Sequence, residues 1–185
     1  MKFRAWSALL VVASTICVVT PSLADIKKGD KLQTLANMHP DMQRRVLYTL
    51  NYQLAGLIPV CSDVTVTNVG KKKLAFEYNG QEFEIAYEGF SEGAGVSFQK
   101  AVQAIYLGPA CDKAKMQRLS KVDQEGIRSG QPRVGMTREG VLFAMGRPPF
   151  HANPDLSSSS WRYWKNRFAQ MTVDFGDDGK VSSVQ

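Results

Sequence analysis

An Asn-Gly pair between two alternating runs is the feature that most constrains the fold of this chain. Asn79-Gly80 suits a two-residue hairpin turn, because both residues tolerate the positive φ angles that such a turn needs. The flanking runs KLAFEY (73–78) and EFEIAY (82–87) place apolar side chains at every second position, and DVTVTNV (63–69) does the same just before them. We therefore predict an antiparallel meander of three short strands between residues 62 and 88.

Helical spacing is predicted on both sides of this meander. After it, a helix starts near Val96 and ends at Gly108-Pro109, with its apolar face formed by Phe98, Val102, Ile105 and Tyr106. Before it, a helix is expected to start at Asp41 and to end at Gly56 and Pro59, with its apolar positions at Met42, Val46, Leu47, Leu50 and Leu54. Residues 25–40 are polar and mixed, and we expect them to form a mobile lead.

The first 24 residues predict export. Lys2 and Arg4 precede an apolar run from residue 5 to residue 19, and small residues stand at Ser22 and Ala24. This order is typical of a secretory signal peptide that is cleaved after Ala24. An uncleaved anchor and lipidation at Cys17 are the alternatives. Lipidation is disfavoured because a bacterial lipobox has Gly, Ala or Ser just before the Cys, and this chain has Ile16 there.

The two remaining cysteines, Cys61 and Cys111, predict a disulfide. They form an even pair in a chain that is expected to enter an oxidising compartment. A bond between them would close a loop of about 50 residues and contribute roughly 4 kcal/mol in the chain-entropy model. The alternative is a reactive thiol, but neither cysteine has a histidine near it in the sequence.

The charge balance gives little support for nucleic-acid binding. The chain has 23 basic and 17 acidic residues, and removal of Lys2 and Arg4 with the signal leaves 21 against 17, a net charge of +4. No stripe of Lys and Arg interleaved with aromatic residues is present. We therefore expect no nucleic-acid partner.

The C-terminal part predicts two helices followed by three antiparallel strands. Residues 112–130 have helical character and are expected to form a connector helix. A second helix starts at Thr137, a good N-cap, and ends at Gly146, where a left-handed conformation is expected. Strands follow at 161–164, in FAQMTVDF (168–175) and in KVSSV (180–184), with GDDGK (176–180) as a tight turn.

This part resembles the SmpA/OmlA (BamE-like) family. The likeness rests on G-M-T-x-E-x-V-x-x-x-M-G-x-P from Gly135 to Pro148, on W-x-Y-W from Trp161, and on V-D-F-G-D-D-G-K-V from Val173. It covers about 55 residues, 131–185, roughly a third of the mature chain. The resemblance implies an ααβββ fold, a location in the bacterial envelope and a role in binding proteins rather than in catalysis, either in outer-membrane assembly or as an inhibitor of enzymes.

Two features depart from that family. BamE is a lipoprotein anchored through an N-terminal Cys, and we expect this chain to lack that anchor. Residues 25–110 of this chain also form an additional block outside the resemblance. We therefore predict an α+β protein in four parts: a signal peptide (1–24), a disulfide-tied block with a β-meander and flanking helices (25–111), a connector (112–130) and a BamE-like domain (131–185).

The candidate partner-binding residues are aromatic and basic. On a strand, Trp161 and Tyr163 share one face, whereas Arg162 and Trp164 share the other. Trp, Tyr and Arg often anchor interfaces, so we expect one of these pairs to contact a partner protein. Packing of both faces within the chain is the alternative. Arg147 and Phe150, in the preceding loop, complete the candidate set.

Catalytic and metal-binding patterns are weak. His39 and His151 are the only histidines, and with the cysteines committed to a disulfide they give no zinc set, so we predict neither metal nor cofactor. The lysine run at 71–73 is predicted to be a solvated turn; contact with anionic headgroups or the cell wall is the alternative. An envelope hydrolase would have to use Asp41 or Glu82 as acid or base.

The sequence thus predicts a non-catalytic binding or scaffold protein, periplasmic or associated with the outer membrane. Its expected partner is an envelope protein, with the outer-membrane assembly machinery as the specific expectation from the resemblance. A secreted or periplasmic enzyme inhibitor that docks through its sheet face is the first alternative, and the hydrolase is the second.

Overall fold

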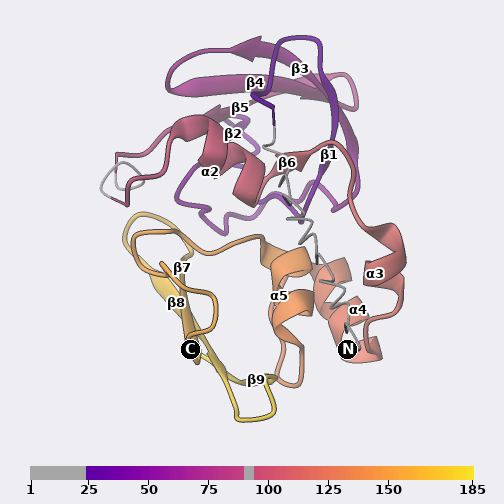
Figure 1. The fold of residues 1–185 in the computed structure, drawn as a ribbon, viewed down its shortest axis with the longest axis vertical. Helices are drawn as coiled ribbons and strands as arrows, with labels where there is room; N and C mark the ends of the chain where they lie inside the picture. The colour runs from indigo at the N-terminus through magenta and orange to yellow at the C-terminus, as the bar shows by residue number, and fades with distance from the viewer. Residues whose placement is uncertain (1–23, 90–93) are drawn as a thin grey trace, which may run out of the picture.

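The computed structural model describes residues 24–89 and 94–185, which form a mixed α+β fold in two packed halves. The N-terminal half (24–111) and the C-terminal half (112–185) lie one above the other in Figure 1. The predicted signal peptide and Cys17 lie outside the described residues.

The N-terminal half is built on a curled six-stranded sheet. Its strand order is β2-β5-β4-β3-β1-β6, and only the β2–β5 pair is parallel. The strands are β1 (Lys31–Thr34), β2 (Val46–Tyr48), β3 (Asp63–Val69), β4 (Lys73–Tyr78), β5 (Gln81–Ala86) and β6 (Leu107–Gly108). The predicted meander is confirmed as β3–β4–β5, and Asn79 and Gly80 turn between β4 and β5 with φ angles of 50° and 73°.

One helix and the disulfide complete this half. Helix α2 (Phe98–Ile105) is confirmed, and it buries Phe98, Val102 and Ile105 in the same core as the inward side chains of β3, β4 and β5. Cys61 and Cys111 are bonded, with their Cα atoms 5.3 Å apart. The predicted disulfide therefore links the entry of β3 to the segment after β6.

The predicted helix from Asp41 is wrong. Residues 41–50 form turns around the short strand β2, because Arg45 and Asn51 have positive φ angles of 52° and 49° that a right-handed helix does not contain. Met42, which the helix would have placed on its apolar face, is 52% exposed. The backbone instead pairs with β5 in register.

Residues 25–40 are also more structured than the expected mobile lead. They contain β1, which pairs with both β3 and β6. Ile26, Ala36 and Met38 are buried, as is the polar residue Asn37. This segment therefore contributes to the core of the N-terminal half.

The C-terminal half contains three helices and a three-stranded antiparallel sheet. The helices are α3 (Lys113–Gln117), α4 (Lys121–Ser129) and α5 (Arg138–Met145), and the strands are β7 (Ser160–Trp164), β8 (Gln170–Phe175) and β9 (Val181–Val184). The order is β7-β8-β9. The expected single connector helix is two helices, because Ser120 and Asp123 form a capping box that starts a new helix at Lys121.

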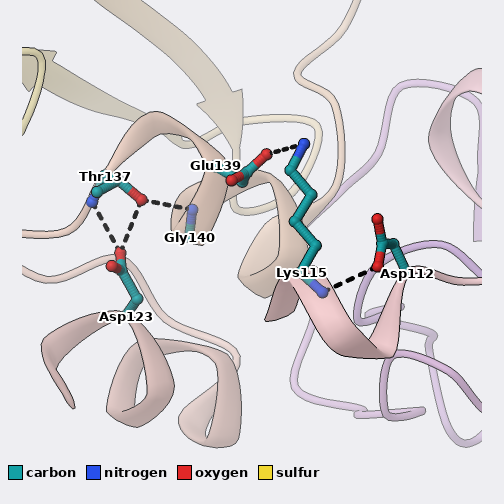
Figure 2. A network of polar contacts seen from close by, with 6 residues as sticks. All are labelled: Asp112, Lys115, Asp123, Thr137, Glu139 and Gly140. Atoms are coloured by element: carbon teal, nitrogen blue, oxygen red, sulfur yellow. Dashed lines mark hydrogen bonds and ion pairs between the residues drawn. The ribbon is translucent and has the colours of Figure 1, made fainter. Parts of the chain in front are cut away.

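A buried carboxylate joins α4 to α5. The Asp123 side chain accepts a hydrogen bond from the Ser120 hydroxyl. It also accepts the Thr137 backbone N–H at 2.7 Å, and the Thr137 hydroxyl accepts the Gly140 N–H (Figure 2). The predicted Thr137 N-cap is thus confirmed. A Cβ at Gly140 would lie 2.0 Å from an Asp123 oxygen, so the close approach of the two helices requires glycine there.

Polar side chains of the N-terminal half cap the C-terminus of α5. The last carbonyls of a helix lack partners within the helix. Phe143 O accepts the backbone N–H of Asn37, and Ala144 O lies within hydrogen-bond distance of the side chains of Asn37 and His39. Met145 O accepts from the side-chain amides of Asn51 and Gln53. The two halves are therefore joined by hydrogen bonds of buried groups as well as by apolar contact.

Gly146 lets the two halves approach at this junction. It ends α5 with φ 73° as expected, but its ψ of 178° is extended rather than left-handed helical. A Cβ on Gly146 would lie 3.1 Å from Asn51 Nδ2 and 3.3 Å from Ile105 O. A larger residue would require these neighbours to shift by a few tenths of an ångström, and the positive φ also disfavours residues other than glycine.

Candidate partner-binding surface

The inner face of the three-stranded sheet is packed, not open. Trp161 and Tyr163 share one face as predicted; it is this inner face, where they are 1% and 0% exposed. Trp161 packs edge-on against Phe175, and the Tyr163 hydroxyl donates to Gly146 O at 2.9 Å. Burial raises the pKa of Tyr163 well above its usual value. These two candidates are therefore core residues.

The outer face carries the other predicted pair. Arg162 is exposed and Trp164 is half-buried, and the neighbouring outward side chains of β8, such as Gln170 and Thr172, are polar. The Trp164 ring lies 5.1 Å from the ring of His151. Burial and then the charge of Arg162 lower the pKa of His151, which favours a neutral imidazole beside the indole.

The edge of β7 that does not pair with β8 is covered by other segments of the chain. The side chain of Asn153 accepts the Arg162 N–H and donates to Arg162 O, as a neighbouring strand would. Two residues further along β7, the Gln53 N–H donates to Trp164 O at 2.8 Å, and Tyr52 forms a parallel bridge to Trp164. Partner binding at Trp164 would therefore use side chains rather than the addition of a strand.

Arg147 and Phe150 lie, like Asn153, in the loop between α5 and β7. The Arg147 guanidinium stands 3.6 Å from the centre of the Phe150 ring and donates to the carbonyls of Pro148 and Asn153. Phe150 also packs against the core of the N-terminal half. The two residues hold the loop in place, and neither belongs to the outer sheet face.

Three further aromatic residues lie on the segments that neighbour Trp164 in the sequence or in the strand pairing. Phe168 was expected inside a strand, but it lies in the turn between β7 and β8 and is 83% exposed. The Arg167 guanidinium covers its ring at 4.6 Å. Tyr48 and Tyr52 lie with ring centres 5.3 Å apart. We call Tyr48, Tyr52, Trp164 and Phe168 together the aromatic surface.

A mixed cleft of about 350 Å³ lies at Tyr48 and Tyr52, the N-terminal members of this surface. Both halves line it, with Tyr48, Tyr52 and Glu88 from the N-terminal half and Asn166 and Arg167 from the C-terminal half. Burial and then the Glu88 carboxylate raise the pKa of Tyr52, so its hydroxyl stays protonated and able to donate. Clustered aromatic rings beside charges of both signs suit recognition of a protein surface.

The residues considered for hydrolysis do not share a site. Asp41 lines the mixed cleft, where its carboxylate accepts the backbone N–H groups of Gln43 and Arg44 in a turn. Glu82 lies on β5 across from Glu77 and accepts the Thr67 hydroxyl at 2.7 Å. It is not among the residues that line the cleft with Asp41.

Among the described residues, the histidines considered as ligands belong to no metal-binding group, and the lysine run lies in a turn. His39 is buried at the junction of the halves, and residues 24–89 and 94–185 contain no group of three or more His, Cys, Asp or Glu that could hold a metal ion. Lys71 and Lys72 are exposed in the β3–β4 turn, and Lys73 pairs with Glu84 at 2.9 Å.

Two wider observations concern membranes and relatives. Within the described part of the chain, each helix is too short or too polar to span a bilayer. Comparisons of the chain with protein-family models, with curated proteins and with solved structures found no match.

Proposed function

We propose that this chain is a non-catalytic binding or scaffold protein of the bacterial cell envelope, exported to the periplasm and held at the outer membrane by a protein partner. Its narrower form is an accessory role in outer-membrane protein assembly or envelope integrity. The sequence resemblance of residues 131–185 to the SmpA/OmlA family and the signal-peptide pattern of residues 1–24 motivate the location and the class of partner.

The single observation that supports a binding role is the aromatic surface. Large apolar side chains cost free energy when they face water, and monomeric proteins seldom gather them without a use. Phe168 is exposed in the turn that follows β7, Trp164 at the end of β7 is half-buried, and the exposed Arg162 shares the sheet face of Trp164. Interfaces concentrate their binding energy in Trp, Tyr and Arg.

The test is recovery of partners with and without this surface. Tagged protein would be crosslinked in cells, purified from detergent-solubilised envelopes and examined by mass spectrometry. The Arg162→Ala/Trp164→Ala variant should lose the partners of the wild type, whereas Tyr78→Ala, a half-buried aromatic on the other sheet, should keep them. Equal recovery by both variants would reject the aromatic surface as the binding site.

An enzyme inhibitor is the second candidate, and the exposed Phe168 favours it. A single aromatic side chain on a tight turn can enter the cleft of a target enzyme. Recovery of one soluble enzyme, lost in Phe168→Ala, would support the inhibitor. Recovery of barrel-assembly subunits would support the scaffold.

A further inference from the structure

An apolar groove lies between the two halves, away from the aromatic surface. Its volume is about 220 Å³, and none of the four residues of the aromatic surface lines it. Half-buried apolar side chains of both halves form its walls; they include Leu35, Leu142, Phe143 and Leu156, with the exposed Ala104 of α2 at the rim. At about 30 Å³ for a group of water size, it has room for about seven such groups.

Two charged residues line the groove: Glu139 has an ion-pair partner, whereas Arg147 donates hydrogen bonds only to neutral carbonyl groups. Glu139, in the first turn of α5, forms an ion pair with Lys115 of α3 (Figure 2). Arg147, just beyond the other end of α5, donates only to backbone carbonyls, those of Pro148, Asn153 and Pro154. No carboxylate of the described residues lies within ion-pair distance of its guanidinium.

Arg147 is therefore a half-buried cation without a counter-charge at one end of an apolar groove. Burial lowers the pKa of Arg147, which is the direction expected when a charged group loses water. A charge in such a place is stabilised by an anion. A carboxylate matches the planar guanidinium best, because it can accept two parallel hydrogen bonds.

The size and charge of the groove specify the ligand. Glu139 and Met145, the last residue of α5, are six residues apart, so about 9 Å of helix separates them at 1.5 Å per residue, and Arg147 follows two residues beyond this end. Leu142 and Phe143 lie between them and give an apolar wall. The complementary ligand is a chain of apolar groups that carries its one negative charge at one end.

We propose that this groove binds a medium-length acyl chain that ends in a carboxylate, with the chain along Leu142 and Phe143 and the carboxylate on Arg147. The site is separate from the proposed partner-binding surface, so either proposal can fail without the other. Arg147, selected from the sequence as a partner-binding residue, would contact a small amphiphile instead.

The first experiment compares two probes of equal length. Octanoate and octan-1-ol would be titrated into the disulfide-bonded protein, with calorimetry for affinity and methyl NMR shifts of Leu35, Leu142 and Leu156 for location. Octanoate should bind at least tenfold more tightly than octanol, because only octanoate has a carboxylate for the guanidinium. Both should shift the same methyl signals.

Two variants test the position of the ligand. Ala104→Phe should fill the groove from its exposed rim and abolish the binding of both probes, whereas Ala114→Phe, on an exposed position of α3, should not change it. Arg147→Gln should remove the preference for octanoate over octanol while octanol still binds. If this variant fails to fold, Ala104→Phe still decides.

Three outcomes would overturn the proposal. The first is the absence of methyl shifts with octanoate at millimolar concentration. The second is equal binding of octanoate to Ala104→Phe and to the wild type. The third is binding of acetyl-Ala-Leu, a peptide with a C-terminal carboxylate, without binding of octanoate, which would assign the groove to a peptide terminus.

Discussion

Replacement of Asn37 by alanine should destabilise both halves of the molecule at once. Its side chain donates to Ile127 O at 2.6 Å and to Ala144 O at 3.2 Å, and accepts the Val60 N–H at 2.8 Å. At about 1 kcal/mol each, the three hydrogen bonds contribute about 3 kcal/mol.

The groups left behind add to this cost unequally. Ala144 O keeps His39 Nε2 nearby, and Ile127 O keeps the Gly130 N–H. The Val60 N–H loses its partner, which costs about 1–3 kcal/mol where water does not reach it. We therefore expect a loss of about 4–6 kcal/mol, a large part of the about 5–15 kcal/mol by which a typical domain is stable.

The assay is urea unfolding followed by tryptophan fluorescence. Trp161 and Trp164 lie in the C-terminal half, whereas Asn37 lies in the N-terminal half, so the probe reports the half that is not mutated. Far-UV circular dichroism follows both halves together. Both signals should shift to lower urea by the same amount.

The exposed Asn68 supplies the matched control. Asn68→Ala should change stability by no more than about 0.5 kcal/mol, as is usual at surface positions. If Asn37→Ala leaves the tryptophan transition where it is in Asn68→Ala, the halves unfold independently and the reasoning is wrong.

Three further predictions concern single features of the fold. Burial lowers the pKa of His39, so as the pH falls the unfolded state takes up the proton before the folded state does. The free energy of unfolding should therefore fall as the pH drops below about 6.5, and chemical unfolding at several pH values should show a smaller fall in His39→Gln. The Cys61→Ser/Cys111→Ser variant should lose about 4 kcal/mol, measured by thermal or urea unfolding, because the bond closes a loop with a sequence separation of 50. Gly140→Ala should lose about 3 kcal/mol or more in the same assay, because its Cβ would overlap the Asp123 carboxylate.

Each of these has a contrasting result. An identical pH slope in wild type and His39→Gln would place the acid sensitivity elsewhere. Equal stability of the oxidised wild type and the double-serine variant would contradict the loop-entropy reasoning. For Gly140 the control is Gly89→Ala, where a Cβ would meet nothing within 4 Å, and equal effects at the two positions would reject the steric explanation.

The parts of the fold that could be predicted from sequence are those set by local chemistry. Asn79-Gly80 specifies a hairpin by its φ angles, and Thr137 specifies a helix start by its side-chain oxygen. Cys61 and Cys111 are a pair in a chain with no other cysteine outside the predicted signal peptide. Each of these signals needs only a few neighbouring residues.

The helix expected from Asp41 was wrong because distant contacts override local spacing. Val46 and Leu47 are buried since β2 pairs with β5, about 40 residues further along the chain. Arg45 O accepts the Glu84 N–H, and the Thr49 N–H donates to Ala86 O, which fixes an extended backbone. A pattern of apolar residues within one segment contains no information about that partner strand.

The candidate site was predicted in part for the same reason. Alternation on β7 correctly separated Trp161 and Tyr163 from Arg162 and Trp164, but it could not say which pair faces the helices. Phe168 continued an apolar pattern into β8, although the strand begins only at Gln170.

The aromatic surface exists only when the two halves are packed together. Tyr48 and Tyr52 come from the N-terminal half, whereas Trp164 and Phe168 come from the C-terminal half. The hydrogen bond from the Gln53 N–H to Trp164 O joins the two pairs, and the Gln53 side chain also caps α5. The block outside the family resemblance therefore supplies half of the aromatic residues and part of the support of α5, so residues 131–185 alone would present a different surface from the whole chain.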